Sequence, residues 1–147
     1  MKIIYYDETY LQDCASIFMD HYNSEEYGCS FNRLKATTYL QEIIYKPRFV
    51  GLLMMKKNKV IGFAFCHLRT WDEKDDLHID ELLVKEEQPE EEVKAKLLNF
   101  IESYTKNYEL AGITTTTNSL AVTDFYLKND FLDHDVTFLY KGIAKPS

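Results

Sequence analysis

The sequence predicts a fold of the α/β or α+β class, built around one mixed sheet. Short apolar runs with strand character alternate along the chain with longer amphipathic segments, and no stretch rich in Gly, Pro or Ser separates them. The chain has 147 residues, of which 46% are hydrophobic, and this suffices for one core. We therefore expect a single domain over residues 1–147.

The first half of the chain predicts a strand, two helices and a hairpin. A strand is expected at residues 3–6, followed by a helix. The apolar face of that helix carries Leu11, Cys14, Ala15, Phe18 and Tyr22. A second helix ends before Pro47, because the residue before a proline is pushed out of the helical region. Two apolar runs, residues 49–55 and 60–68, predict an antiparallel hairpin.

The second half predicts a strand at 77–84 and then a helix that begins at Pro89. Proline suits the first helical position because its missing N–H is not needed there, and the three glutamates that follow favour the positive end of the helix dipole. The remaining expected elements are a strand at 113–117, a helix capped by Asn118 or Ser119, and a final strand at 135–143.

The charge of the chain argues against several classes of partner. The net charge is −7, and no basic patch is apparent in the sequence, so we expect no nucleic-acid and no membrane partner. The apolar stretch at the amino end is broken by Asp7 and Glu8, too early for a signal peptide or a membrane span. The three cysteines lack any C-x-x-C pairing, which predicts free thiols and a cytoplasmic location.

Three segments, taken in order, resemble the GNAT superfamily of N-acetyltransferases over nearly the whole chain. They are the hairpin around Gly51 and Gly62, the strand Ile79-Asp80-Glu81-Leu82-Leu83-Val84 with its following helix, and the late segment Phe125-Tyr126-Leu127-Lys128-Asn129-Asp130-Phe131. The resemblance implies a mixed, mostly antiparallel central sheet flanked by helices. It also implies acetyl-coenzyme A as co-substrate.

In that family the main chain of the strand holds the pantetheine arm, and a loop of the form R/Q-x-x-G-x-G/A wraps the pyrophosphate. The resemblance therefore gives a set of cofactor-binding positions: Leu82, Leu83, Val84, Gln88, Glu92, Val93, Lys94 and Asn118. For Asn118 a helix cap is the alternative. The loop positions fall on residues 89–94, where no glycine remains. The pyrophosphate loop is therefore degenerate.

The glutamates of this loop oppose an anionic ligand. A carboxylate about 4 Å from a phosphate charge costs roughly 1 kcal/mol in water and about 4 kcal/mol at an effective dielectric of 20. Three glutamates, Glu90 to Glu92, could weaken binding on the order of 100-fold or more. We expect weak binding of the coenzyme.

The resemblance also implies catalytic residues. Tyr126 matches the family's tyrosine that protonates the leaving thiolate, and Glu81 lies where such enzymes place a base that acts through water. The alternatives are a packing aromatic for Tyr126 and a solvated or salt-bridged carboxylate for Glu81.

Substrate residues are expected around the same strand. Asp80, Tyr27 and Trp71 are candidates to line the acceptor pocket, and the acidic residues 72–92 favour a cationic amine acceptor. The alternating polar residues Asp76, His78 and Asp80 could be imagined as a metal site, but a solvated sheet face explains them as well, and no metal is predicted. Cys66 lies beside His67 and should face the other side of the strand, as a packing residue.

Two classes of function remain open. The first is an N-acetyltransferase that moves an acetyl group from acetyl-coenzyme A to a primary amine of a small cationic acceptor. The second is a non-catalytic binding or scaffolding protein with this fold and weak or lost coenzyme binding. A homodimer that binds another ligand in the cleft between the strands at Val84 and Ile113 is a weaker alternative.

Overall fold

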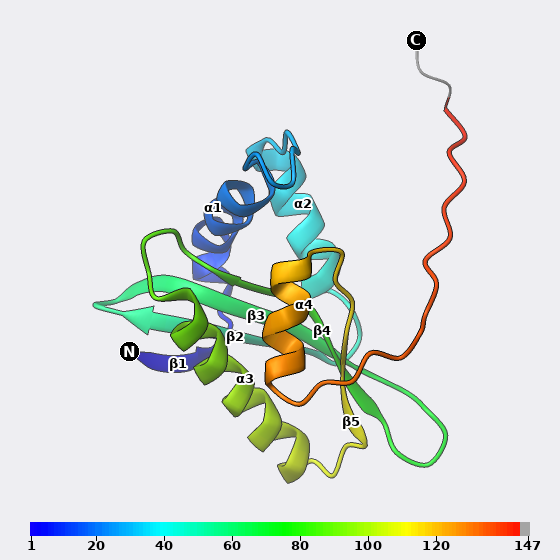
Figure 1. The fold of residues 1–147 in the computed structure, drawn as a ribbon. Helices are drawn as coiled ribbons and strands as arrows, with labels where there is room; N and C mark the ends of the chain where they lie inside the picture. Colours follow the sequence, from blue (N-terminus) through cyan, green and yellow to red (C-terminus); the bar gives the residue numbers. More distant parts are fainter. Residues whose placement is uncertain (145–147) are drawn as a thin grey trace. The chain divides into compact units, whose positions relative to one another are not determined.

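The computed structural model describes residues 1–144 and divides them into two compact units, which meet at Thr116 and Thr117 and are described separately (Figure 1). The first unit contains β1 (Lys2–Tyr5), a 3-10 turn η1 (Glu8–Tyr10), α1 (Leu11–Tyr22), α2 (Arg33–Ile44), β2 (Phe49–Lys56), β3 (Lys59–Arg69), β4 (Asp76–Val84), α3 (Glu90–Asn107) and β5 (Gly112–Thr115). The second unit contains α4 (Leu120–Lys128).

The five strands form one sheet in the order β1-β2-β3-β4-β5. The first four are antiparallel to their neighbours, and β5 runs parallel to β4. The predicted hairpin is confirmed, and its two-residue turn places Lys57 and Asn58 at φ 51° and 63°. Two successive positive φ angles are typical of the type I′ turn, whose twist matches that of the strands. The predicted mixed, mostly antiparallel sheet is therefore confirmed.

Helices cover both faces of this sheet (Figure 1). On one face α1 and α2 pack against the sheet and form a hydrophobic core with it. This core includes Cys14, Phe18 and Leu40 from the helices and Leu53, Phe63 and Phe65 from the strands. On the opposite face α3 contributes a buried stripe of Val93, Leu97, Leu98 and Ile101. Helix α3 begins at Glu90, one residue later than predicted, because Pro89 has an extended backbone and lies at the N-cap.

The sheet opens between its two parallel strands. Pairing of β4 with β5 covers Asp76–Ile79 against Gly112–Thr115 and ends there, where the Thr115 hydroxyl donates to the Ile79 carbonyl at 3.1 Å. From Asp80 to Val84, β4 continues beside β3 alone. Among the strands of residues 1–144, none pairs with the other edge of this segment, and we call the opening the fork.

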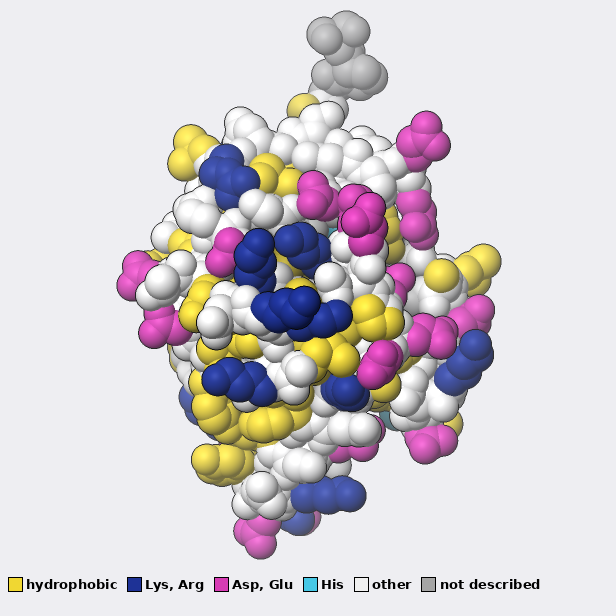
Figure 2. Space-filling view, turned by 90° about the vertical axis from the view of Figure 1, so that its left-hand side faces the viewer, with side chains coloured by type: hydrophobic (Ala, Val, Ile, Leu, Met, Phe, Trp, Pro, Cys, Tyr) yellow, Lys and Arg dark blue, Asp and Glu magenta, His cyan; other side chains and the backbone are white. Residues whose placement is uncertain are grey.

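Lysine side chains gather at the end of the sheet that holds the β2–β3 turn (Figure 2). The cluster consists of Lys2, Lys56, Lys57, Lys59 and Lys85. Lys85 joins it because its N–H donates to the Ile61 carbonyl at 2.8 Å. No ion pair joins these lysines to a carboxylate within the described chain. The expectation that the chain has no basic patch is therefore wrong, because the sheet brings together lysines from three separate segments.

The second unit is organised around α4. Ser119, not Asn118, is the N-cap, and its Oγ accepts from the Val122 N–H at 3.5 Å. The ring centroids of Tyr126 and Phe131 lie 4.9 Å apart. The strand predicted at residues 135–143 is absent: these residues have no strand partner within the described chain, and a lone strand leaves its backbone groups unpaired.

Close packing of α3 on the sheet makes a testable prediction at Gly62. A Cβ at this position would lie 2.9 Å from Cγ1 of Val93 and 3.1 Å from the Leu83 carbonyl oxygen. Overpacking of this kind costs about 1–3 kcal/mol. Gly62→Ala should therefore lower the free energy of unfolding by that amount in a urea titration. Gly112→Ala is the matched control, since its nearest atom is 4.0 Å away and it should change stability by less than about 0.5 kcal/mol. Equal stability of the two variants would contradict the prediction.

Candidate functional site

A β-bulge in β4 lies where the fork opens. Phe65 of β3 is opposite Glu81, and the next residue, Cys66, is opposite Ile79, so Asp80 is an extra residue in β4. Neighbouring strand residues normally point to opposite faces, and a bulge removes this alternation locally. Both carboxylates accordingly find partners from the α1 and α2 side: Glu81 from the two helices, and Asp80 from the residues that follow α2.

Glu81 is buried and held by two phenols. Its side chain accepts hydrogen bonds from the Tyr39 hydroxyl at 2.8 Å and from the Tyr22 hydroxyl at 2.8 Å. Only 6% of the residue is exposed, and this burial raises the pKa of Glu81 to about 7. The phenol hydrogen bonds act in the opposite direction on this pKa. A carboxyl group with a pKa near neutrality can accept or donate a proton at physiological pH.

Asp80 belongs to a separate, charge-compensated group. One of its oxygens lies 2.9 Å from the Lys46 ammonium, and the other lies 2.6 Å from Nδ1 of His67. The ring of His78 is 5.5 Å from that of His67, and its Nδ1 contacts the Thr114 hydroxyl at 2.8 Å. Burial lowers the pKa of His78 to about 4, so this imidazole is neutral at pH 7. The alternating polar residues thus form an internal network.

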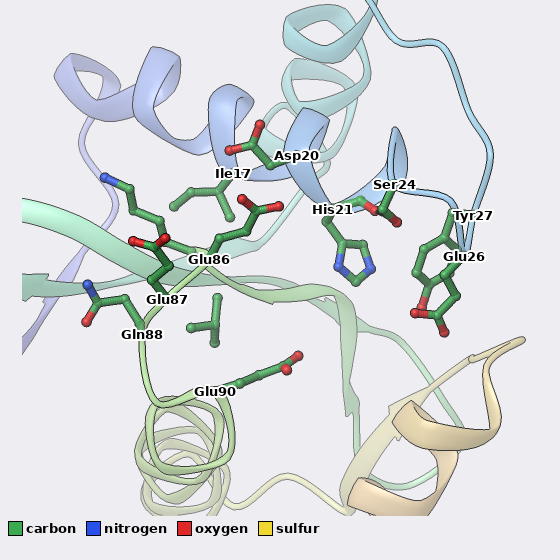
Figure 3. A pocket seen from close by; sticks show the side chains of 12 residues that line it. Ile17, Asp20, His21, Ser24, Glu26, Tyr27, Glu86, Glu87, Gln88 and Glu90 are labelled. Atoms are coloured by element: carbon green, nitrogen blue, oxygen red, sulfur yellow. Dashed lines mark hydrogen bonds between the residues drawn. The ribbon is translucent and has the colours of Figure 1, made fainter.

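An open pocket of about 190 Å³ lies between the end of α1 and the turn from β4 to α3 (Figure 3). Its charged lining consists of Asp20, Glu26, Glu86, Glu87, Glu90 and Lys85. His21 and Tyr27 add an aromatic wall, with ring centroids 4.6 Å apart. Burial, together with the nearby Lys94, lowers the pKa of His21. Five carboxylates against one lysine favour a cation in this pocket over an anion.

At the beginning of α3, two glutamates form ion pairs with lysines of the same helix. Glu90 pairs with Lys94 at 3.2 Å and Glu92 pairs with Lys96 at 3.1 Å, each across one helical turn. Lys94 is nearly buried, with 7% of its side chain exposed. In the loop pattern R/Q-x-x-G-x-G/A, Glu92 and Lys94 stand at the two small-residue positions. The carboxylates do not fit a diphosphate, whereas the open main-chain edge of residues 80–84 fits an extended amide arm.

The predicted cofactor-binding residues lie in different parts of the structure and do not form one site. Val84 and Gln88 line the pocket, and Leu82 and Leu83 are buried side chains on the segment of β4 that borders the fork. Val93 packs against Gly62, so its side chain belongs to the core and not to the pocket. Asn118 is an exposed residue of the second unit.

The predicted substrate residues also separate. Tyr27 lines the pocket, and its ring lies 5.3 Å from that of Tyr22. Trp71 lies in the loop before β4, is 74% exposed, and donates its N–H to Asp75 at 3.4 Å. Tyr126 lies in the second unit with its carbonyl accepting the Phe131 N–H.

Sequence reasoning missed the residues that hold the two carboxylates. Tyr22 is predicted as part of a buried stripe, but Tyr39 and Lys46 are not singled out at all. Tyr39 lies beside the buried Leu40 but is itself 36% exposed, so its burial gives no signal. Its partner Glu81 is 42 residues away in the sequence, and no local pattern indicates it.

Within residues 1–144, no group of three or more His, Cys, Asp or Glu side chains is placed to hold a metal ion. No helix of that part of the chain is long and apolar enough to cross a membrane.

Comparison with known proteins identifies the fold. No family model matches the sequence, and no curated protein matches it. Among solved structures, a "possible acetyltransferase" from Clostridium difficile 630 has a TM-score of 0.81 at 13% identity and covers 98% of each chain. An aminoglycoside acetyltransferase from an uncultured soil metagenomic sample, in complex with trehalose, has a TM-score of 0.74 at 15% identity and covers 97% of this chain and 96% of its own. A transcriptional regulator from Bacillus halodurans C-125 has a TM-score of 0.75 at 9% identity, with 97% and 99% covered.

The matches cover 97–99% of this chain, and four of them are named as acetyltransferases. The chain therefore has the fold of the GNAT acetyltransferases. Identities of this size establish the fold alone, so the reaction is argued from the residues themselves.

The buried carboxyl of Glu81 makes a prediction about stability. Its pKa in the folded state, about 7, lies above its usual 4.5, so between these pH values the folded state binds more protons than the unfolded state. Wild-type stability contributed by this group is therefore lost as pH rises. Between pH 5 and pH 8 the free energy of unfolding should fall by about 2–3 kcal/mol more in the wild type than in Glu81→Gln. Chemical denaturation at several pH values measures this difference.

Glu73→Gln is the control for this prediction, because it removes an exposed carboxylate from the loop before β4. This variant should follow the wild type at every pH. A difference between wild type and Glu81→Gln that does not grow with pH would show that Glu81 has an ordinary acidity.

Proposed function

We propose that this protein is an N-acetyltransferase that acetylates a primary amine of a small cationic acceptor, with Glu81 as the group that accepts the amine's proton. The observation that supports this most directly is the position of Glu81: a buried carboxyl with a pKa near 7 lies at the bulge where the fork opens. The GNAT fold supports the reaction class.

Different residues of the chain carry out coenzyme binding and proton transfer in this proposal. The edge of β4 from Asp80 to Val84 offers main-chain N–H and C=O groups to an extended pantetheine arm. Acetyl-coenzyme A supplies the thioester: the amine nitrogen forms the new C–N bond as the C–S bond breaks, and the coenzyme leaves as a thiol. Glu81 removes the proton that the amine loses, directly or through one water. Tyr126 is retained as the acid for the leaving thiolate on the family resemblance.

The charges of the pocket support a cationic acceptor. Asp20 at the end of α1 and Glu26 in the segment after it lie on its wall, and Tyr27 offers a ring face to an ammonium group. Asp80, which the sequence suggests as an acceptor ligand, is engaged by Lys46 and His67, so the proposal does not assign it to the acceptor.

A transfer assay tests the proposal. Purified protein, acetyl-coenzyme A and a panel of cationic amines such as spermidine and free lysine should give an acetylated product by mass spectrometry. Glu81→Gln should lower kcat/KM at pH 7.5 by about 100-fold, the usual contribution of a general base. Tyr126→Phe should lower kcat as well.

Glu73→Gln serves as the control for the assay and should retain full activity. Absence of product with every amine would reject the transferase proposal. Full activity of Glu81→Gln would reject the role of Glu81 but keep the reaction class.

A second candidate function is a non-catalytic binding protein with this fold. The observation that favours it is the start of α3, where two glutamate–lysine pairs and Pro89 replace a glycine-rich anion cradle. The structural likeness to a transcriptional regulator supports the general point that this fold is compatible with other roles.

The negative charges around the turn from β4 to α3 predict the affinity for acetyl-coenzyme A. Glu86→Gln combined with Glu90→Gln removes two negative charges next to the expected diphosphate. At roughly 1 kcal/mol each, the double variant should bind acetyl-coenzyme A about 10- to 30-fold more tightly in calorimetry. Glu102→Gln is the control, because it lies on the same helix about 18 Å further along. Unchanged affinity of the double variant would show that these carboxylates do not oppose the coenzyme.

A further inference from the structure

Two phenols from different helices meet at one carboxylate. Tyr39 of α2 donates to Oε1 of Glu81 at 2.8 Å. Tyr22 of α1 donates to Oε2 at 2.8 Å and also lies 3.2 Å from Oε1. The two tyrosines precede Glu81 by 42 and 59 residues, so the tertiary fold alone creates this arrangement.

The rings of both tyrosines are held by a common aromatic cluster. The ring of Phe18 lies 4.6 Å from that of Tyr22 and 4.9 Å from that of Tyr39, with centroids as end points. Phe31 packs edge-on against Phe18 at 4.8 Å. Both rings pack against Phe18, although Tyr39 is 36% exposed. This shared contact places both hydroxyls at the same carboxylate.

The two hydrogen bonds also bear on the proton of Glu81. An ionised carboxylate accepts hydrogen bonds at both oxygens and binds phenol donors more strongly than the protonated form does. Burial has the opposite effect and is the larger of the two. Other titratable or charged groups lie on the elements around the site: Tyr27, Glu42, Lys46, His67, His78 and Asp80. Of these, Asp80 opposes ionisation of Glu81, and its own charge is compensated by Lys46.

We propose that Tyr22 and Tyr39 are positioning residues that hold the Glu81 carboxylate in one orientation at the fork and favour its proton-accepting form. The role of this arrangement in catalysis rests on the proposed function. The effect of the two tyrosines on the pKa of Glu81 does not, because they contact Glu81 directly. The effect can thus be measured with or without acetyl transfer.

A carboxyl titration tests the proposal. Protein labelled with ¹³C at the glutamate carboxyl carbons is titrated by NMR from pH 4 to pH 10, with Glu81→Gln used to assign the signal. The midpoint for Glu81 should lie near 7 in the wild type. Tyr22→Phe and Tyr39→Phe each remove a donor to the ionised form and should raise the midpoint by about one pH unit. The double variant should raise it further.

Tyr45→Phe is the matched control. Tyr45 lies at the end of α2 with 73% of its surface exposed, and the same substitution there should leave the midpoint unchanged. The proposal is overturned if neither single variant moves the midpoint, or if the control moves it by the same amount.

A second measurement does not depend on folding of the phenylalanine variants. Replacement of all 11 tyrosines by 3-fluorotyrosine makes each phenol a stronger donor, so the Glu81 midpoint should move down. An unchanged or raised midpoint would also overturn the proposal.

The two proposals can fail separately. Shifted midpoints in a protein that transfers no acetyl group would leave the positioning role intact and reject the proposed function. Where transfer is observed, the acid limb of the kcat profile should move upward with the midpoint in each variant. Transfer with unshifted midpoints would reject the positioning role alone.

Discussion

One extra residue in β4 is the constraint on which the site depends. The bulge at Asp80 places two successive carboxylates on the side of the sheet that α1 and α2 cover, where regular alternation would have placed only one. Buried carboxylates require donors, and the fold supplies two phenols to Glu81 and two nitrogen groups to Asp80. The same bulge lies where β5 leaves β4, so the open main-chain edge and the buried carboxyl of Glu81 occur together.

The beginning of α3 is stabilised by charges within the helix itself. Glutamates in a first helical turn stabilise the helix by their interaction with its dipole, and here two of them also pair with lysines one turn later. A helix end stabilised in this way no longer needs an external anion. The first unit thus combines a strand fork, as in the fold of its structural neighbours, with a turn whose charges oppose an anionic ligand.

Much of the fold follows from local patterns. The hairpin, the helices ending at Tyr22 and Ile44, and the parallel strand before Thr116 all have strong periodicity or clear turn residues, and the structure confirms them. The strand predicted at 135–143 is wrong, because alternating apolar residues make a strand only when another strand offers hydrogen bonds. The lysine cluster was missed for a related reason: its members are far apart in sequence and meet only at the end of the sheet.

The sequence by itself determined the elements up to residue 128, the acidic character of residues 72–92 and the loss of glycines from the turn before α3, since each of these is a property of neighbouring residues. Its resemblance to the GNAT superfamily also singled out Glu81 as a candidate base. Only the tertiary structure decided what surrounds that carboxyl. Three features depend on contacts between segments that are distant in sequence: the register shift between β3 and β4, the hydrogen bonds of Tyr22 and Tyr39 to Glu81, and the ion pair of Asp80 with Lys46. Such contacts produce no periodic pattern in the sequence.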